Sequence, residues 1–313
     1  MNSKAKLHPK NKHNQDYNFD RLCKAVPELA RFIVNKHGKQ TVDFANPAAV
    51  RLLNKALLKD DYGIEHWDIP ESSLCPAIPG RVDYVHYLAD LLHSTFQSES
   101  GHNKAKVLDI GTGASCIYPL LGYKSYGWRF VATDIDFQSI KIAKQIVNAN
   151  HGLPKAIEVR HQKQSHQIFH GMIKAHDKFH LTMCNPPFHD SPEQAAKGTN
   201  RKWQNLGKAQ QKNVPPTLNF AGRANELWCK GGELAFIRNM VRESRHYQQQ
   251  VAWFTSLVSK KDNVSPIKLA LKKANAKQIK VVKMSQGQKI SRFIAWSFLT
   301  PEEFTRWHLK GLK

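Results

Sequence analysis

Four consecutive residues, Asn185, Pro186, Pro187 and Phe188, could do chemistry on an amine. They follow a short apolar run at residues 179–184 that is typical of a buried strand. An amine conjugated with a purine ring is a poor nucleophile, because its lone pair is delocalised. The Asn185 side-chain oxygen and the Pro186 carbonyl can accept its two N–H bonds, and the prolines hold both acceptors in place. The Phe188 ring can stack on a base that has left its helix or loop.

A second group of residues could hold a nucleotide cofactor. Its members are Asp109, near the end of an expected strand at residues 107–110, and Gly111, Gly113 and Ser115 in the turn that follows this strand. Glycines let the backbone approach a ligand closely while the turn bends into a helix, and the third glycine of a dinucleotide site is missing. An acid before G-x-G resembles the methyltransferase form, in which the loop cradles the methionine part of S-adenosylmethionine. Asp134 ends the next expected strand and can accept both ribose hydroxyls, with Asp136 as a nearby alternative.

Strands and helices are predicted to alternate around these motifs. Strands are expected at residues 107–110, 130–133, 157–159, 181–184, 233–237, 251–258, 279–284 and 293–299, with a crossover helix at residues 140–150. This alternation indicates an α/β protein with a doubly wound sheet and an antiparallel edge, the Rossmann-like fold of class I methyltransferases. The order of the G-x-G turn, the strand-two acid and Asn-Pro-Pro-Phe then predicts methyl transfer from S-adenosylmethionine to a planar nitrogen.

The amino-terminal part is expected to form a separate module. Residues 1–95 are predicted as a small, basic, mostly helical unit, and residues 96–313 as the methyltransferase domain. Helices are expected at residues 17–37, 48–58 and 81–96, joined by an extended piece at residues 41–44 and a loop at residues 69–82. Asn46 is expected to cap the second helix, because Pro47 suits the first helical position.

The charge balance points to a polyanionic partner. Lys and Arg number 47 against 25 Asp and Glu, which gives a formal net charge of +22. Such a surplus neutralises phosphates and releases their counterions, although it does not separate RNA from DNA or from an acidic membrane. Residues 197–212 are basic and carry no acid. They lie in a long polar segment, residues 191–223, which we expect to order on a nucleic acid through Arg201 and Lys202.

Composition also bears on compartment and cofactors. The five cysteines are far apart and form no Cys-x-x-Cys pair, which favours reduced thiols in a cytoplasmic protein. No apolar run reaches the roughly 18 residues of a membrane helix, and no signal-peptide core follows the basic amino terminus. Four histidines between residues 161 and 176 lack a Cys or acid to complete a metal site. We therefore expect a monomeric enzyme without a metal.

Five segments together resemble one family. They are residues 42–44, 78–86, 109–120, 183–188 and 231–234. The chain is similar, from residue 8 to about residue 298, to the bacterial 23S rRNA adenine-N6 methyltransferases of the RlmF type. It also resembles their eukaryotic relative, which methylates adenosines in small structured RNAs. The run Gly-Ala-Ser-Cys-Ile-Tyr-Pro-Leu at residues 113–120 is the most specific part of this likeness.

The resemblance implies methylation of N6 of one adenosine in 23S rRNA, either free or in a large-subunit precursor. It also implies that the amino-terminal helices bind RNA, which makes Lys10 and Lys12 candidate contacts. Arg81 would reach the cofactor carboxylate, which a guanidinium can grip by two parallel hydrogen bonds. Gln164 and His189 stand where the eukaryotic relative has a Thr and a Phe. The resemblance therefore assigns no contact to Gln164, and it allows His189 either a role in the base pocket or a structural one.

Two alternatives stay open at this point. Related Asn-Pro-Pro-aromatic motifs occur in enzymes that methylate a guanine amine, a DNA adenine or a protein glutamine. A non-catalytic rRNA-binding assembly factor could also keep the fold without the activity. The intact Asn185, Gly111, Gly113 and Asp134 argue against this second alternative.

Overall fold

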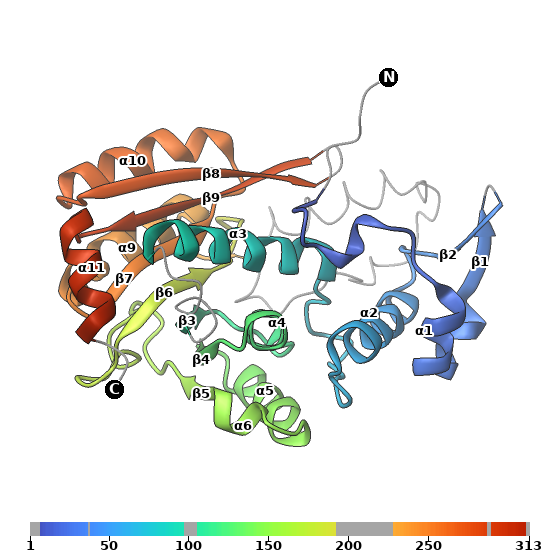
Figure 1. Ribbon diagram of the computed structural model, residues 1–313. Helices are drawn as coiled ribbons and strands as arrows, with labels where there is room; N and C mark the ends of the chain where they lie inside the picture. The colour runs from blue at the N-terminus through green and yellow to red at the C-terminus, as the bar shows by residue number, and fades with distance from the viewer. Residues whose placement is uncertain (1–6, 37, 97–104, 192–227, 287–288, 311–313) are drawn as a thin grey trace.

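The fold is built on one seven-stranded sheet. The computed structural model describes residues 7–36, 38–96, 105–191, 228–286 and 289–310. The strands are β3 (Lys106–Ile110), β4 (Arg129–Asp134), β5 (Ile157–His161), β6 (Phe179–Cys184), β7 (Val251–Leu257), β8 (Gln278–Gln286) and β9 (Lys289–Ser297). Their order is β5-β4-β3-β6-β7-β9-β8, which Figure 1 shows from bottom to top. β3 to β7 are parallel, and β9 runs antiparallel between β7 and β8. The predicted doubly wound sheet with an antiparallel edge is confirmed.

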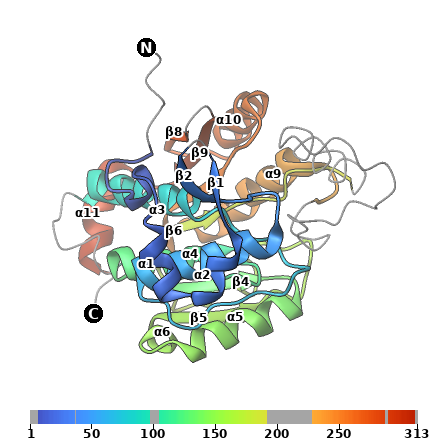
Figure 2. The same ribbon diagram turned by 90° about the vertical axis from the view of Figure 1, so that its right-hand side faces the viewer.

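Helices cover both faces of this sheet. They are α3 (Ile78–Phe96), α4 (Ile117–Tyr126), α5 (Phe137–Ala149), α6 (Leu153–Ala156), α9 (Gly232–Ser244), α10 (Val264–Lys273) and α11 (Pro301–Lys310). Successive strand residues point to opposite faces, so Val107 joins a core with α3, α4 and α5, and Leu108 joins a core with α9 and α10. β6 is buried along its whole length, as a central parallel strand should be. Figure 2 shows α5 and α6 at the β5 end of the sheet and α10 at the β8 end.

The amino-terminal part contains α1 (Phe19–Ala25), α2 (Pro47–Tyr62) and a hairpin of β1 (Ile33–Lys36) with β2 (Lys39–Val42). The Asn46 side chain accepts hydrogen bonds from two backbone N–H groups of α2, which confirms the predicted cap. The helix predicted over residues 17–37 is wrong beyond residue 25. Pro27 has no N–H to continue α1 and instead opens a 3-10 helix (Pro27–Phe32), after which residues 33–36 enter the hairpin.

The strand predicted over residues 233–237 is also wrong, because these residues belong to α9. Gly231 and Gly232 have φ values of 80° and 62°, and the helix starts directly at this left-handed turn. Its buried positions Ile237, Met240 and Val241 follow helical spacing. Further 3-10 helices are Lys12–Asn14, Arg245–Tyr247 and Lys261–Asn263.

The first core continues from the sheet into the amino-terminal helices. Leu57 of α2 and Val85 of α3 belong to the same buried cluster as Val107 of the sheet. The Trp67 indole N–H, in the segment after α2, donates to the Ser115 carbonyl at 3.0 Å. The amino-terminal segment therefore supports the loop that follows β3.

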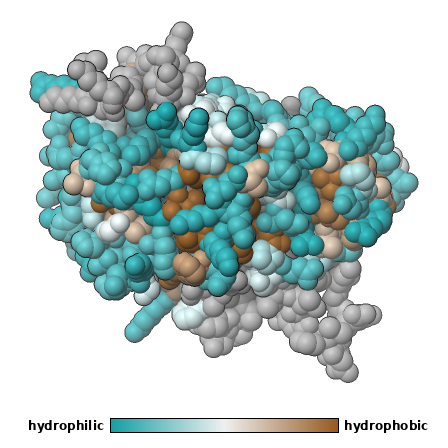
Figure 3. Space-filling view, turned by 90° about the horizontal axis from the view of Figure 1, so that it is seen from below, coloured by the Kyte–Doolittle hydropathy of each residue, from teal (hydrophilic) through white to brown (hydrophobic). Residues whose placement is uncertain are grey.

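The surface seen from below is mainly hydrophilic, with hydrophobic side chains showing between the hydrophilic ones (Figure 3). Among the described helices, none combines the length and the apolar character that crossing a bilayer requires.

Candidate functional site

A cavity of about 700 Å³ lies at the carboxyl ends of β3, β4 and β6. β4 and β6 flank β3 on opposite sides, so the order of the strands reverses at β3. Open α/β sheets bind ligands at such a topological switch point. Of the residues proposed from the sequence, Arg81, Gly111, Gly113, Ser115, Asp134, Asn185 and Pro187 line this cavity. The G-x-G turn and the Asn-Pro-Pro motif are thus brought together, as their positions after neighbouring strands require.

The glycine turn leaves room for a ligand. Gly111 and Gly113 have φ values of 74° and 64°, which residues other than glycine rarely adopt. A Cβ atom on Gly111 would meet nothing within 4 Å, so the backbone borders open space. The N–H groups of Gly111 and Thr112 both donate to the Thr133 carbonyl at 2.9 Å, which fixes the turn against β4. These features fit close approach of a cofactor to the backbone.

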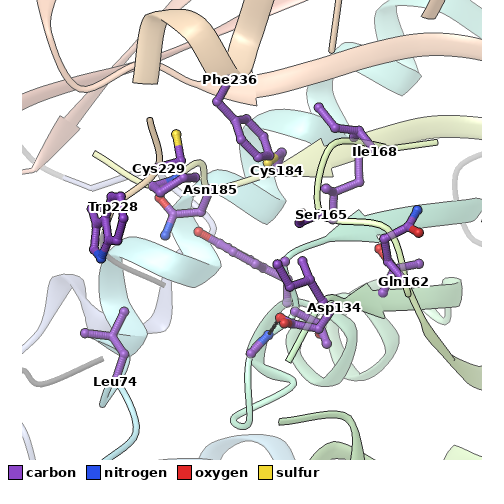
Figure 4. Close-up of a pocket in the computed structure, with 18 of the residues that line it drawn as sticks. Leu74, Asp134, Gln162, Ser165, Ile168, Cys184, Asn185, Trp228, Cys229 and Phe236 are labelled. Atoms are coloured by element: carbon purple, nitrogen blue, oxygen red, sulfur yellow. Dashed lines mark hydrogen bonds between the residues drawn. The ribbon is translucent and has the colours of Figure 1, made fainter. Parts of the chain in front are cut away.

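Asp134 presents a buried carboxylate beside this turn. Its two oxygens accept hydrogen bonds of 2.8 Å from the Gly113 and Asp136 N–H groups. Burial raises the pKa of Asp134, and these hydrogen bonds act in the opposite direction. The Asp136 carboxylate instead caps α5, accepting from the N–H and hydroxyl of Ser139. Asp134 rather than Asp136 therefore lines the cavity (Figure 4).

Asp109 lies behind the turn and has no exposed surface. Neither of its carboxylate oxygens has a hydrogen-bond partner among the described residues. Burial is the main cause that raises the pKa of Asp109, and the nearby Asp134 carboxyl acts in the same direction. Thr112 and Arg81 lower it, and the net result is a pKa of about 7. The Thr112 hydroxyl is close, although its geometry is not that of a hydrogen bond. An acid in this state would be stabilised by a cationic ligand group.

Arg81 extends from α3 and is held by Tyr118 of α4. Its Nη1 donates to the Tyr118 hydroxyl at 2.8 Å, and the guanidinium carbon lies 5.6 Å from the centre of the same ring. Tyr118 in turn meets the Tyr84 ring edge-on at 5.7 Å. The orienting role of Tyr118 escaped the sequence analysis, because the two residues lie 37 positions apart.

Asn185 follows β6 with its side chain at the cavity. Its Oδ1 atom is buried and has no hydrogen-bond partner in the part of the chain that the structure describes. Pro187 lines the cavity, Pro186 is buried, and Phe188 is half-buried without lining it. A buried acceptor without a donor costs free energy, so a ligand N–H would be stabilised at this position.

Trp228 is a lining residue that the sequence analysis did not identify. Its indole N–H is buried and, like Asn185 Oδ1, has no partner among the described residues. Figure 4 shows Trp228 and Leu74 on the Asn185 side of the cavity, with Gln162 on the Asp134 side. The backbone of His189 holds this region together, because its carbonyl accepts the Cys229 N–H at 3.0 Å.

The remaining proposed residues lie elsewhere. Lys10 is exposed, whereas the Lys12 ammonium donates to the Asp61 carbonyl at 2.7 Å and lies over the Tyr62 ring. The Gln164 N–H donates to the Gln162 side chain, and Gln164 itself does not line the cavity. Arg201, Lys202 and residues 192–223 of the basic segment lie outside the described residues. Within the described ranges, no three His, Cys, Asp or Glu side chains gather as metal ligands would.

The sheet order, the G-x-G turn with an acid on the next strand, and the amide motif after β6 define a class I methyltransferase. A family model described as "RNA methyltransferase" matches residues 1–300, so the chain belongs to this RNA methyltransferase family. It is 57% identical over 297 residues to a protein of Colwellia psychrerythraea named ribosomal RNA large subunit methyltransferase F, covering 93% of this chain and 99% of the relative. A protein of the same name from Pseudomonas syringae is 55% identical over 298 residues, covering 95% and 90%.

Solved structures of human METTL16 are similar in fold. The catalytic domain in complex with a MAT2A 3′UTR hairpin superposes with a TM-score of 0.79 and 30% identity, covering 94% of this chain and 96% of that one. The amino-terminal domain in complex with S-adenosylhomocysteine gives a TM-score of 0.74 and 28% identity, covering 94% and 100%. The protein is therefore an enzyme, an RNA methyltransferase that uses S-adenosylmethionine.

Proposed function

We propose that this enzyme methylates the N6 amine of one adenosine in 23S rRNA. The unpaired, buried Oδ1 of Asn185 carries the proposal, because it offers an acceptor to an exocyclic N–H at the end of β6. The Pro186 carbonyl would accept the second N–H bond, and Phe188 would stack on the extruded base. The names of the bacterial relatives support a large-subunit rRNA substrate.

We further propose how this chain holds the cofactor. Asp134 would accept the ribose hydroxyls, Arg81 would grip the carboxylate, and Asp109 would balance the ammonium group behind the glycine turn. Gly111, Gly113 and Ser115 would line the methionine part. The bound cofactor supplies a methyl group already activated on its sulfonium. The protein then needs mainly to orient the two reactants and to accept the amine N–H bonds, with no covalent enzyme intermediate. No strong general base is needed, because the amine proton becomes acidic once the N–C bond has formed and can then pass to solvent.

The RNA contacts are proposed from charge and placement. Residues 1–95 would act as the RNA-binding module. Lys10 is exposed and would meet phosphate directly, and Lys12 would do so from the 3-10 helix Lys12–Asn14, where its ammonium also donates to the Asp61 carbonyl of α2. Arg201 and Lys202 would add contacts from the basic segment. We propose that the enzyme acts as a monomer in the cytoplasm, on 23S rRNA or a large-subunit precursor.

Methyl transfer from labelled S-adenosylmethionine tests this function. Wild-type protein should label 23S rRNA but not the same RNA depleted of adenosine, duplex DNA or a glutamine-containing release-factor peptide. Digestion to nucleosides should place the label in N6-methyladenosine. Label in N2-methylguanosine, DNA or peptide would refute the assignment of substrate. Binding of rRNA and cofactor without any transfer would favour the assembly factor instead.

A further inference from the structure

Glu243, near the end of α9, binds a loop that is remote from it in sequence. Its carboxylate accepts the Ile168 N–H at 2.9 Å, the Phe169 N–H at 2.8 Å and the His170 N–H at 3.4 Å. Its other oxygen also lies 3.1 Å from the Ile168 nitrogen. Hydrogen bonds from consecutive N–H groups to an anion are stronger than bonds to a neutral acceptor. One side chain of α9 therefore fixes three successive backbone groups.

The loop held by Glu243 forms one wall of the cavity. Ser165, His166, Gln167 and Ile168 are all among the lining residues. The loop begins beside the proposed ribose acid, because the Gln162 N–H donates to the Asp134 carbonyl at 2.8 Å. β5 lies next to β4 in the sheet, so the chain leaving β5 covers the side of Asp134 that faces away from Asn185. The methyl group must face Asn185, so this wall would contact the adenosine end of the cofactor.

Other contacts hold the same loop at Gln162, His166 and Phe169, and Glu243 adds its backbone hydrogen bonds at residues 168–170. Gln162 is buried, and its amide donates to the His170 carbonyl at 2.9 Å. Phe169 is fully buried against the second core. Asn239, one turn before Glu243 on α9, donates to the His166 carbonyl at 3.0 Å. Ser165 and His166 themselves are exposed, so no hydrophobic burial fixes their backbone.

We propose that Glu243 is a positioning residue for the cofactor: it sets the wall formed by residues 165–168 and thereby the affinity for the adenosine part of S-adenosylmethionine. This inference rests on the proposed placement of the cofactor. Glu243 does not line the cavity and touches no reacting atom. Its effect should therefore fall on cofactor affinity, with little effect on the methyl-transfer step at saturating cofactor.

The same helix provides a matched control. Glu233, at the start of α9, is buried and accepts the Ser259 N–H at 2.6 Å, the Lys260 N–H at 3.3 Å and the Asn263 amide at 2.7 Å. It fixes the loop at residues 259–263, which contributes no residue to the described cavity wall. Glu233→Gln and Glu243→Gln each remove one loop-binding charge from α9, but only Glu243 holds a loop that lines the cavity.

The experiment is calorimetric titration of both variants with S-adenosylhomocysteine, with hydrogen exchange of residues 162–172. We expect Glu243→Gln to raise the Kd about tenfold, as the loss of one charge-assisted hydrogen bond would. It should also raise the KM for S-adenosylmethionine at nearly unchanged kcat, and speed exchange in this segment. Glu233→Gln should lower the Tm but keep the Kd within about twofold of the wild type, a margin far below the tenfold step.

A Glu243→Gln Kd equal to that of the wild type would overturn the inference, and so would an equal rise in both variants. If Glu243→Gln does not fold, Glu243→Asp keeps the charge at shorter reach and should raise the Kd less. Asp134→Ala separates the two proposals, because its side chain is the proposed ribose ligand. An unchanged Kd for Asp134→Ala would refute the cofactor placement, whereas an unchanged Kd for Glu243→Gln alone would refute only the loop inference.

Discussion

Replacing Asp109 by Asn should stabilise the cofactor-free protein and weaken cofactor binding. The Asp109 carboxyl is fully buried without a hydrogen-bond partner among the described residues, and burial raises its pKa from 3.8 to about 7. The folded protein therefore binds this proton more tightly than the unfolded chain does. The resulting stabilisation is complete below the unfolded pKa and is lost as pH rises through the folded pKa. Asn removes this titration while keeping a similar shape.

The magnitude follows from the two pKa values. Between pH 5 and pH 7, the wild-type carboxyl loses about 2 kcal/mol of stabilisation, since the unfolded chain releases the proton first. The free energy of unfolding of Asp109→Asn minus that of the wild type should rise by this amount over the same interval. Titrations common to both proteins cancel in the difference.

Urea unfolding followed by tryptophan fluorescence measures this difference at pH 5, 6 and 7 without cofactor. S-adenosylhomocysteine should restore stability to the wild type at pH 7 more than to Asp109→Asn, because only the wild type offers a charge to the ammonium group. A difference that is independent of pH would show that Asp109 does not titrate in this range. Equal stabilisation of both proteins by the ligand would refute its assignment to the cofactor.

Three further substitutions test the other parts of the cavity. Asn185→Ala should lower kcat about a hundredfold or more, because it removes one preorganised polar group from the reacting centre. The Kd for S-adenosylhomocysteine should stay nearly unchanged, and an equal loss of both would contradict the assigned role. Tyr118→Phe removes the hydroxyl that holds Arg81 and should raise the Kd for S-adenosylhomocysteine about fivefold, as measured by calorimetry. An unchanged Kd would exclude a role of Tyr118 in orienting Arg81. Trp228→Phe keeps an aromatic side chain but loses the unpaired indole N–H, so the KM for RNA should rise and the cofactor Kd should not. The reverse pattern would place Trp228 in the cofactor half.

The sequence predicts those elements whose local pattern and tertiary setting agree. β3 and β6 are short apolar runs bounded by a Gly turn and a Pro turn, and both are buried central strands. Residues 233–237 are equally apolar, but five residues are too few to distinguish a period of 2 from one of 3.6. The left-handed Gly231-Gly232 turn decides the outcome, and such a conformation is not visible in residue types alone.

The roles of the cavity side chains could likewise be predicted from the sequence only in part. Asp134 and Asp136 are two positions apart and chemically identical, and only the capping of α5 by Asp136 separates their roles. The motifs flanking the strands could be recognised because each occupies a few consecutive positions. Tyr118 and Glu243 could not, because each acts through contacts with a segment remote in the chain.

Buried polar groups without hydrogen-bond partners indicate a ligand site only where several of them lie around one cavity. Within the described residues, Ser291 Oγ and Trp307 Nε1 are also buried and unpaired, so such atoms alone do not locate a site. Asp109, Asn185 and Trp228 differ because they gather where two neighbouring parallel strands end, around or directly behind a single cavity. They comprise an acid and an amide oxygen, which need a cation or N–H donors, and an indole N–H, which needs an acceptor. A sulfonium amino acid and a purine together carry groups of all these kinds, so binding both ligands would satisfy atoms that folding alone leaves unpaired.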